Sequence, residues 1–493
     1  MRSFSGSLLA LALALTVVHA QTAPPAATPA PAAAPAATPA APLAAPVAPA
    51  AQTAAPAAAA RRPAPPVQPT FPVPPALKGT VAFACGQGKN GALSLFANTL
   101  YTEKSAGWDL KTAPKVENGT CSSDKPFFFS IPVPEGNYRV TILFGGPMDT
   151  LVTVRAEARR LMLEKVSVTA HETVQKAFDV NVRVPEFLNP DGTPNRVRLK
   201  QREFGNLNWD NKLTIEFNGV NPSFHAFSIK PLTGSFVDTV VYLAGDSTMV
   251  DQDTDPWASW GQQLPRFFRT GVAIANNAES GETSASFQGE LRFAKVMSVI
   301  KPGDYFFMQF NHNDQKPGAV PLDRYKEILT SFVTQVRAKG AIPVIVTAQH
   351  RRSFDATGHI TNSLGDYPDA ARKVAADTHT YLIDLTAMSE VLFNAMGDEG
   401  SKHAFMYFPA NSLPGQTREY ADNTHFNSYG AYELARCIVK GIRQNKMAIA
   451  AFLDPTVPDI DPAKPDPFDK FSLPATPMQT QEDPTKIPQA NLQ

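Results

Sequence analysis

Residues 240–247 read VVYLAGDS, an apolar run that ends in glycine, aspartate and serine. A short, unbroken apolar run is typical of a strand that is buried on both faces, as in a parallel sheet. The glycine lets the chain turn sharply, so Ser247 is expected at the carboxyl edge of this sheet, ahead of a helix. Asp and Ser are also ordinary turn and N-cap residues, so the tripeptide alone does not establish a nucleophile.

The sequence after this run alternates between strand and helix patterns. Further short apolar runs are expected to form strands at 272–275, 305–310, 342–347 and 381–385. Apolar residues at helical spacing mark helices around 328–336 and 431–442. This alternation predicts a three-layer α/β/α domain over residues 238–451, with a parallel sheet and helices on both of its faces. Such sheets carry their sites at the carboxyl ends of the strands.

Residues 77–233 have a different rhythm, with short alternating runs separated by turn sequences such as PEGN at 134–137. Strands are expected at 80–84, 127–131, 138–144, 165–169, 178–184, 212–217 and 224–229. Many short strands with turn residues between them predict an all-β sandwich domain ahead of the α/β domain.

The two ends of the chain have compositions unlike the rest. Residues 1–20 combine a basic start, a short apolar run and a small-residue site, which predicts a secretory signal cut after Ala20 and a secreted or periplasmic protein. Residues 21–76 are almost entirely Ala, Pro and Thr, which favours either a semi-extended spacer or a plain disordered leader. Residues 452–493 are rich in Pro, Asp and polar residues and are expected to form a disordered tail. No other stretch is long and apolar enough to suggest a membrane span.

The charge balance and the histidine spacing argue against several kinds of partner. Lys plus Arg and Asp plus Glu both number 45, so no excess of basic charge supports binding to nucleic acid. The nine histidines show no His-x-x-x-His pair, which disfavours a metal site. We therefore expect neither a metal nor an organic cofactor, and the sequence does not indicate an oligomeric state.

Only three cysteines occur, so disulfides are not the main scaffold. Cys85 and Cys121 lie in the same domain and either form a bridge or remain separate thiols. Cys437 lies in an apolar helical stretch and is expected to be a small buried residue.

A base for Ser247 is found near the end of the α/β domain, in the sequence Asp422-Asn423-Thr424-His425. An aspartate three residues before a histidine can accept its Nδ1–H bond, which fixes the tautomer that takes a proton from a serine. The alternative is a solvated loop histidine next to an N-capping acid.

Two further loops follow strands at the same edge, at residues 276–281 and 311–314. Acyl transfer needs hydrogen-bond donors aimed at the developing oxyanion. The backbone N–H groups of Ser247 and Gly281 and the side-chain amide of Asn313 can supply three. A nucleophile, two donor loops and an Asp/His pair at one sheet edge together favour a serine hydrolase.

Four motifs carry a resemblance to a known family. They are Gly245-Asp246-Ser247-Thr248, Asn277-Ala278 with Gly281, His312-Asn313-Asp314, and Asp422-Asn423-Thr424-His425-Phe426 with Gly430-Ala431. With these motifs, the segment from 238 to about 445 resembles the SGNH (GDSL-type) hydrolases, and within them the rhamnogalacturonan acetylesterase family. The resemblance implies the flavodoxin-like parallel sheet of the SGNH hydrolases. The resemblance implies Ser247 as nucleophile, His425 as base, Asp422 as its orienting acid, and Gly281 and Asn313 as oxyanion donors. Residues 77–233 also resemble the galactose-binding-like β-sandwich that precedes this module in some bacterial relatives.

The chain departs from the family pattern at two places. Asn311 stands where the family usually has glycine, and asparagine tolerates the left-handed backbone better than most residues. Glu282-Thr283 stand where the family commonly shows Arg-Ser. The second departure changes the local charge beside the predicted site.

Four residues are candidates for binding the substrate. Arg351 and Arg352 follow the fourth predicted strand of the α/β domain, and guanidinium groups suit uronic-acid carboxylates. The alternative is a solvated basic loop. Trp108 and Trp209 are either sugar-stacking platforms or core residues, and the core is favoured.

The sequence thus predicts a secreted serine esterase without cofactor that removes acetyl groups from a plant cell-wall polysaccharide. The resemblance implies rhamnogalacturonan or pectin, in acetylated form, as the substrate and partner. The alternatives are an esterase for another acylated glycan or for a lipid, and a glycan-binding protein on a hydrolase scaffold that no longer turns over.

Overall fold

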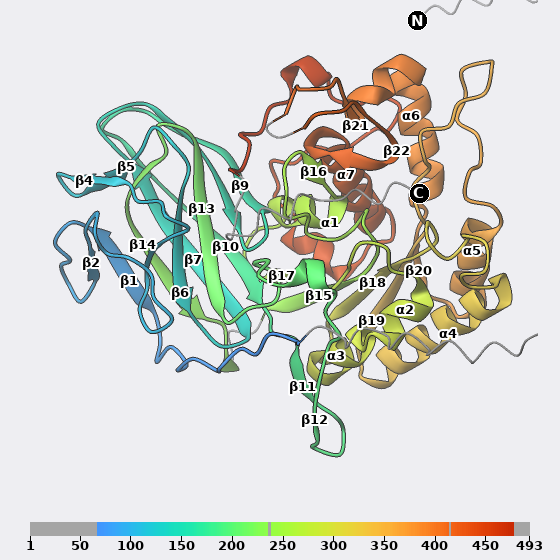
Figure 1. The fold of residues 1–493 in the computed structure, drawn as a ribbon, viewed down its shortest axis with the longest axis horizontal. Helices are drawn as coiled ribbons and strands as arrows, with labels where there is room; N and C mark the ends of the chain where they lie inside the picture. Colours follow the sequence, from blue (N-terminus) through green and yellow to red (C-terminus); the bar gives the residue numbers. More distant parts are fainter. Residues whose placement is uncertain (1–66, 235–237, 414–415, 478–493) are drawn as a thin grey trace, which may run out of the picture. The chain divides into compact units, whose positions relative to one another are not determined.

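A computed structural model gives the structure of residues 67–234, 238–413 and 416–477 (Figure 1). The predicted signal peptide at 1–20, most of the Ala/Pro-rich segment, and residues 478–493 lie outside the described residues. The described residues all belong to one structural unit.

The α/β half is built on a parallel sheet of five strands. They are β15 (Thr239–Gly245), β17 (Val272–Asn276), β18 (Tyr305–Gln309), β19 (Ile342–Val346) and β20 (Tyr381–Ile383). Their order is β17-β15-β18-β19-β20, and every neighbouring pair is parallel. All residues of β17 and β18 are buried, as expected for a sheet covered on both faces. The strand order reverses at β15, and the crevice at such a reversal is where α/β sheets bind ligands.

Helices cover both faces of this sheet. They are α1 (Trp260–Gln263), α2 (Ser284–Gly289), α3 (Arg292–Val299), α4 (Leu322–Ala338), α5 (Tyr367–Asp377), α6 (Leu385–Ser401) and α7 (Ser428–Gln444). Alternate residues of β15 enter different cores: Val241 and Leu243 pack with α1, α6 and α7, while Val240 and Tyr242 pack with α2 to α5. This three-layer α/β/α arrangement confirms the fold class that the alternating pattern predicts.

A small antiparallel sheet accompanies the parallel one in the α/β half. It contains β16 (Trp257–Ala258), β21 (Phe405–Phe408) and β22 (Tyr420–Asn427), in the order β16-β22-β21. Strand β22 carries the Asp/His motif and leads directly into α7.

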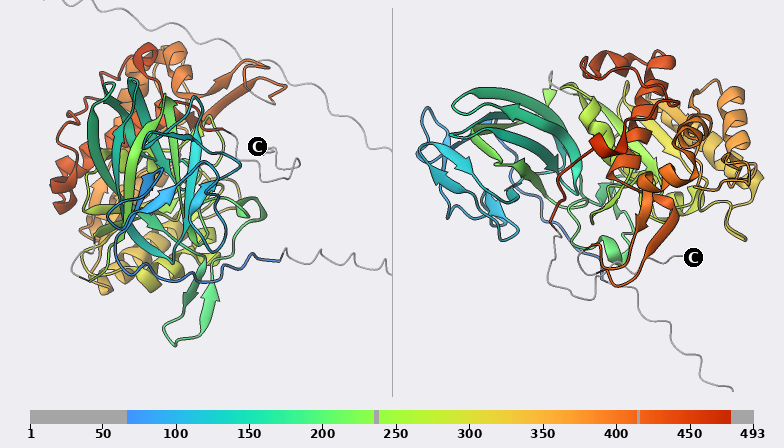
Figure 2. Two further views of the ribbon diagram at one scale, coloured as in Figure 1. Left: turned by 90° about the vertical axis from the view of Figure 1, so that its left-hand side faces the viewer. Right: turned by 90° about the horizontal axis from the view of Figure 1, so that it is seen from above.

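The N-terminal half consists of two sheets that enclose one core (Figure 2). One sheet has the order β10-β7-β14-β1-β2, with β5 and β4 beyond β14, and the other has the order β3-β6-β13-β8-β9. The strands are β1 (Val81–Cys85), β2 (Leu93–Leu95), β3 (Gly107–Asp109), β4 (Lys115–Glu117), β5 (Thr120–Ser122), β6 (Phe127–Pro132), β7 (Gly136–Gly145), β8 (Thr150–Ala156), β9 (Arg160–Val168), β10 (Thr173–Val182), β13 (Lys212–Val220) and β14 (Ser223–Pro231). A separate hairpin joins β11 (Glu186–Leu188) to β12 (Pro194–Arg196).

The core of this half settles two of the alternatives that the sequence leaves open. Cys85 of β1 and Cys121 of β5 form a disulfide. In the α/β half, Cys437 of α7 is a buried free thiol, as predicted. Trp108 and Trp209 are each 2% exposed, so both are core residues and neither is a sugar platform.

The prediction of a disordered tail from 452 onward is wrong for residues 452–477. Leu453, Val457 and Ile460 are buried against the α/β core, and Thr476 Oγ1 donates to Glu216 in the N-terminal half at 2.9 Å. A few apolar residues spaced among prolines are enough to bind this segment to a preformed surface. The predicted spacer likewise ends earlier than 76, because the side chain of Gln68 exchanges two hydrogen bonds with the backbone of Leu199.

Buried ion pairs join the two halves near the end of β15. Arg160 Nε donates to Asp251 Oδ2 at 2.6 Å, and both side chains are almost fully buried. The neighbouring Arg159 donates to the carbonyl oxygens of Gln252 and Trp257 at 3.1 and 2.8 Å. The N-terminal half therefore fixes the segment that follows the predicted nucleophile.

Candidate active site

Ser247 lies in a tight turn directly after β15. The N–H groups of Met249 and Val250 both donate to the carbonyl oxygen of Asp246 at 3.0 Å, which closes the turn. Gly245 is required just before it, because a Cβ there would lie 2.7 Å from the carbonyl oxygen of Gln309 on the adjacent strand. The serine hydroxyl is thus held at the carboxyl edge of the sheet, as the strand-turn pattern predicts.

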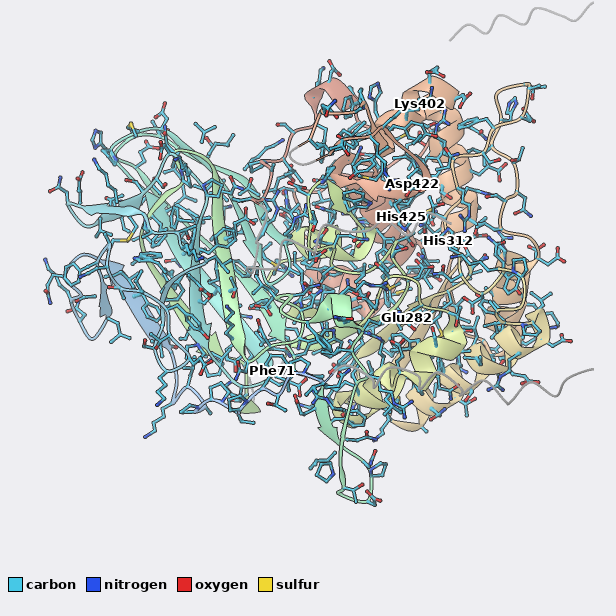
Figure 3. The ribbon with its side chains drawn as sticks, in the orientation of Figure 1. Phe71, Glu282, His312, Lys402, Asp422 and His425 are labelled. Atoms are coloured by element: carbon cyan, nitrogen blue, oxygen red, sulfur yellow. A yellow bond between two sulfur atoms is a disulfide. The ribbon has the colours of Figure 1, made fainter. Side chains whose placement is uncertain are left out.

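His425 and Asp422 meet this serine although His425 is 178 residues away in sequence. His425 Nε2 lies 2.8 Å from Ser247 Oγ, and His425 Nδ1 lies 2.6 Å from Asp422 Oδ2. Figure 3 shows where Asp422 and His425 lie. If Nδ1–H donates to the carboxylate, Nε2 is left as an acceptor facing the serine O–H. The arrangement can therefore move a proton from the serine to the histidine.

Asp422 is held so that it remains an acceptor. Its Oδ1 accepts from the N–H groups of Thr424 and His425 at 2.7 and 3.1 Å, which leaves Oδ2 for the imidazole. Burial pushes the pKa of Asp422 upward, but the hydrogen bond and charge of His425 and the two backbone donors outweigh it, so the pKa lies below the usual 3.8. The carboxylate is consequently ionised at neutral pH.

The two loops predicted to supply oxyanion donors lie at the same edge. The loop after β17 is bound to the end of β15, because Asn277 N–H donates to Leu243 at 2.9 Å and Glu279 N–H donates to Gly245 at 3.1 Å. Gly281 has φ of 76°, a conformation that favours glycine. Asn313 Nδ2 donates to the carbonyl oxygen of Glu282 at 3.0 Å, which joins the loop after β18 to the loop after β17.

The backbone donors near the serine remain available. Within the described part of the chain, neither the Ser247 N–H nor the Gly281 N–H donates a hydrogen bond to another residue. Free N–H groups at the sheet edge that carries the serine are what a site for a developing oxyanion requires.

Two buried acids beneath the site have structural partners that the sequence does not reveal. His312 lies between Asp246 Oδ2, 3.3 Å from Nδ1, and the carbonyl oxygen of Gln349, 3.0 Å from Nε2. Asp314 Oδ1 accepts from the N–H and hydroxyl of Ser284 at 2.8 and 2.6 Å. Burial raises the pKa of Asp314 to about 6. Both acids connect the loop after β18 to neighbouring segments.

Comparison with known proteins matches residues 243–431 to the GDSL-like lipase/acylhydrolase family. The chain is 42% identical over 207 residues to the rhamnogalacturonan acetylesterase RhgT of Bacillus subtilis, across 41% of this chain and 89% of that protein. This chain belongs to the GDSL-like lipase/acylhydrolase family. As a member of that family, it is a carboxylic ester hydrolase.

Two further proteins from Bacillus subtilis resemble this GDSL-like hydrolase. The probable rhamnogalacturonan acetylesterase YesY is 33% identical over 210 residues, covering 41% of this chain and 92% of that protein. A crystal structure of the protein YxiM covers 75% of this chain and 99% of that chain, with 22% identity and a TM-score of 0.41.

Arg351 lies inside the GDSL-like site and joins two of its loops. Its guanidinium donates to Thr424 Oγ1 at 2.7 Å and to the carbonyl oxygen of His312 at 3.0 Å. Burial lowers the pKa of Arg351 below its usual value, and the charges of Asp246 and Asp422 offset this shift only in part. This residue is close to the candidate acid and is only partly exposed.

Arg352 has a different environment, which gives no support to its predicted role in substrate binding. Its guanidinium forms an ion pair with Asp398, donates to Ser401 Oγ at 3.1 Å and stacks over Tyr407 at 5.0 Å from the ring centroid. The Arg352 N–H also donates to the carbonyl oxygen of Asn423 at 2.8 Å. We therefore interpret Arg352 as a support for the loop that carries Asp422.

The described residues contain neither a metal-binding group of side chains nor a membrane-spanning helix. They contain no group of three or more His, Cys, Asp or Glu side chains that could hold a metal ion. None of their helices is both long enough and apolar enough to span a bilayer.

Proposed function

We propose that this hydrolase is an exported acetylesterase that removes acetyl groups from a plant cell-wall polysaccharide, with rhamnogalacturonan as its substrate. The observation that carries the chemistry is the chain of contacts from Ser247 Oγ to His425 at 2.8 Å and from His425 to Asp422 at 2.6 Å. The names of RhgT and YesY support an acetylated rhamnogalacturonan as the substrate.

The proposed reaction runs in two halves. Ser247 Oγ attacks the acetyl carbonyl carbon while His425 Nε2 takes the hydroxyl proton, and the imidazolium is stabilised by Asp422. The oxyanion accepts hydrogen bonds from the N–H groups of Ser247 and Gly281 and from Asn313 Nδ2, and each such donor contributes ~2.7–4 kcal/mol. His425 then gives its proton to the departing sugar oxygen. Water then attacks the acetyl-serine while His425 takes its proton. The proton returns to Ser247 Oγ as acetate leaves.

Export is supported by two independent features. The first twenty residues have the order of a secretory signal, and the Cys85–Cys121 disulfide is of a kind that persists in oxidising compartments. An assay of the culture medium and the periplasm for the mature chain tests this part of the proposal, and retention of residues 1–20 on a cytoplasmic protein contradicts it.

We also propose that Arg351 contacts a uronic-acid carboxylate near the scissile ester, since it lies beside Thr424 at the site. Arg351→Ala is then expected to lose activity on acetylated pectin and to keep most of its activity on a small neutral acetyl ester. Equal losses on the two substrates would end this assignment.

The main test is acetate release from acetylated rhamnogalacturonan, acetylated xylan and a long-chain ester, by wild type and by Ser247→Ala. The expected result is release from rhamnogalacturonan by wild type alone. Preference for xylan or for the long-chain ester assigns the enzyme to another substrate. A glycan-binding protein without turnover is indicated if wild type is inactive on all three and a serine-reactive phosphonate fails to label Ser247.

A further inference from the structure

We propose that Lys200 and Arg202, which belong to the N-terminal half, are positioning residues for the oxyanion donors of the α/β half. This inference rests on the proposed function, because it takes Gly281 and Asn313 as oxyanion donors. It goes further by making the N-terminal half a part of the catalytic apparatus.

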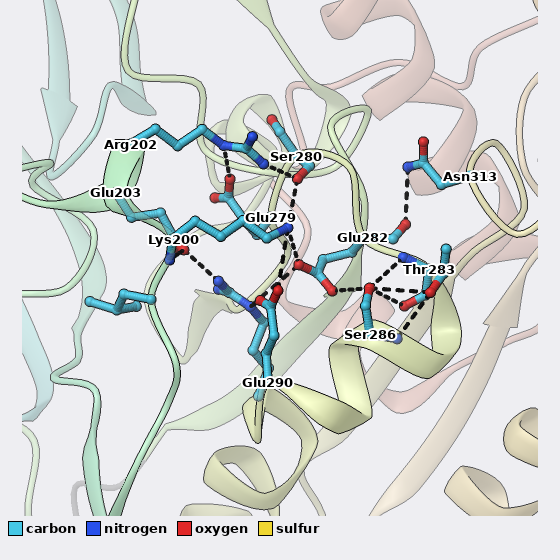
Figure 4. Close-up of polar contacts among 12 residues, drawn as sticks. Lys200, Arg202, Glu203, Glu279, Ser280, Glu282, Thr283, Ser286, Glu290 and Asn313 are labelled. Atoms are coloured by element: carbon cyan, nitrogen blue, oxygen red, sulfur yellow. Dashed lines mark hydrogen bonds and ion pairs between the residues drawn. The ribbon is translucent and has the colours of Figure 1, made fainter. Parts of the chain in front are cut away.

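The contact is made by one short turn. Residues Gln201–Glu203 form a 3-10 turn, η1, which follows the β11–β12 hairpin and lies against the loop after β17 (Figure 4). Lys200 Nζ donates to the carbonyl oxygen of Ser280 at 3.0 Å, and the guanidinium of Arg202 donates to the same oxygen. Arg202 Nε also donates to Glu279 Oε1 at 2.7 Å.

The target of these two cations is the peptide group that carries the proposed donor. The carbonyl of Ser280 and the N–H of Gly281 belong to one peptide unit, and a peptide unit is planar. Holding the oxygen on one side therefore fixes the direction of the N–H on the other side. Charged donors at the oxygen also polarise the unit, which strengthens the N–H as a donor.

Lys200 reaches the second donor through Glu282. The Glu282 carboxylate is fully buried and forms an ion pair with Lys200. The carbonyl oxygen of the same residue accepts from Asn313 Nδ2 at 3.0 Å. Since Asn313 uses one amide hydrogen on Glu282, the position of Glu282 sets where the other hydrogen points.

The turn itself is anchored to the α/β half. Glu203 is buried, accepts from the Lys200 N–H at 2.7 Å and forms an ion pair with Arg292 of α3 at 2.5 Å. These contacts also give a reason for the departure from the family pattern at 282. A glutamate there complements Lys200, whereas an arginine would bring a third cation next to Lys200 and Arg292.

The test uses the full chain and 4-nitrophenyl acetate, a small neutral ester that needs no glycan subsite. Lys200→Met and Arg202→Gln are each expected to lower kcat about 10- to 100-fold and to leave KM within about twofold. Lys200→Arg is expected to recover most of the loss, because it restores the cation. Arg202 is about half exposed, so Arg202→Gln provides a readout if Lys200→Met does not fold.

Glu135→Gln is the matched control. Glu135 also belongs to the N-terminal half and is partly exposed like Lys200, but its carboxylate accepts from Lys295 of α3 at 2.7 Å instead of touching the loop after β17. It is expected to leave kcat unchanged. Unchanged kcat in both test variants, or an equal fall in Glu135→Gln, would overturn the inference. Failure of the proposed substrate is separate, because it appears as inactivity of wild type on glycans while the small ester is still hydrolysed.

Discussion

Replacing Asp422 by asparagine changes one atom of the site and reverses the tautomer of His425. Asp422 Oδ1 accepts from two backbone N–H groups, so the amide oxygen of asparagine is expected to keep that position. Its NH2 group then replaces Oδ2, which lies 2.6 Å from His425 Nδ1. A donor at that place requires Nδ1 to be unprotonated, so the proton moves to Nε2.

His425 Nε2 lies 2.8 Å from Ser247 Oγ, so a proton on Nε2 occupies the position that must accept the serine proton and prevents the imidazole from acting as a base. In Ser-His-Asp hydrolysis the wrong tautomer lowers kcat by about 10⁴-fold, which corresponds to ~5.5 kcal/mol of transition-state stabilisation. Because two of the three hydrogen bonds to the side chain remain, the melting temperature of Asp422→Asn is expected to stay close to that of wild type.

The assay is kcat on 4-nitrophenyl acetate for wild type, Asp422→Asn and Ser247→Ala, with thermal unfolding as the check on folding. Nitrogen-15 NMR of His425 reports which ring nitrogen holds the proton. A folded Asp422→Asn protein that keeps more than about a tenth of wild-type kcat would refute the role of Asp422 as the orienting acid.

Three further predictions concern stability. Cys85→Ala with Cys121→Ala is expected to lower the free energy of unfolding by about 4 kcal/mol, because the disulfide closes a loop with a sequence separation of 36. Thiol titration of the wild type in denaturant should find one thiol before reduction and three after it. Three thiols before reduction would contradict the bridge. Gly430→Ala is expected to cost about 2 kcal/mol or more in chemical denaturation, since the new Cβ would lie 2.1 Å from the carbonyl oxygen of Ala404, and an unchanged midpoint would count against this packing. The folded state keeps the proton of Asp314 up to a pKa of about 6, whereas the unfolded chain releases it near 3.8, so stability should fall by up to about 3 kcal/mol as pH rises through that window. Asp314→Asn should remove this slope, measured by urea unfolding at several pH values, and an identical slope in the variant would show that another group is responsible.

Strands of the parallel sheet are predictable from sequence because they are buried on both faces and read as unbroken apolar runs. The run at 240–244 corresponds to β15, which extends it by one residue at each end. Strand β8 is not predicted from the sequence, because Arg155 interrupts its apolar pattern. In the structure Arg155 is buried and lies 3.3 Å from the carboxylate of Glu216 on the adjacent strand. A buried ion pair cannot be recognised before the pairing of strands is known.

Some residues of the candidate site can be predicted from the sequence and others cannot. Ser247, Asp422 and His425 lie in short motifs whose residue types state their chemistry, so the sequence indicates them. Lys200 and Arg202 lie in no motif, and their importance depends on how two separately patterned halves meet. Glu282 is the residue in the sequence that points to Lys200 and Arg202. Its negative charge, where the family commonly has arginine, indicates that a cation from elsewhere in the chain lies beside the predicted oxyanion donor.

The buried ion pair between Arg160 and Asp251 makes the two halves of this chain depend on each other for stability. The buried Asp251 carboxylate is compensated by Arg160, which lies 91 residues earlier in the chain. Neither segment can therefore be exchanged alone without leaving a buried charge unpaired. Replacing the N-terminal half of this chain by an unrelated module is therefore expected to lower its stability, because Asp251 would stay buried without its partner.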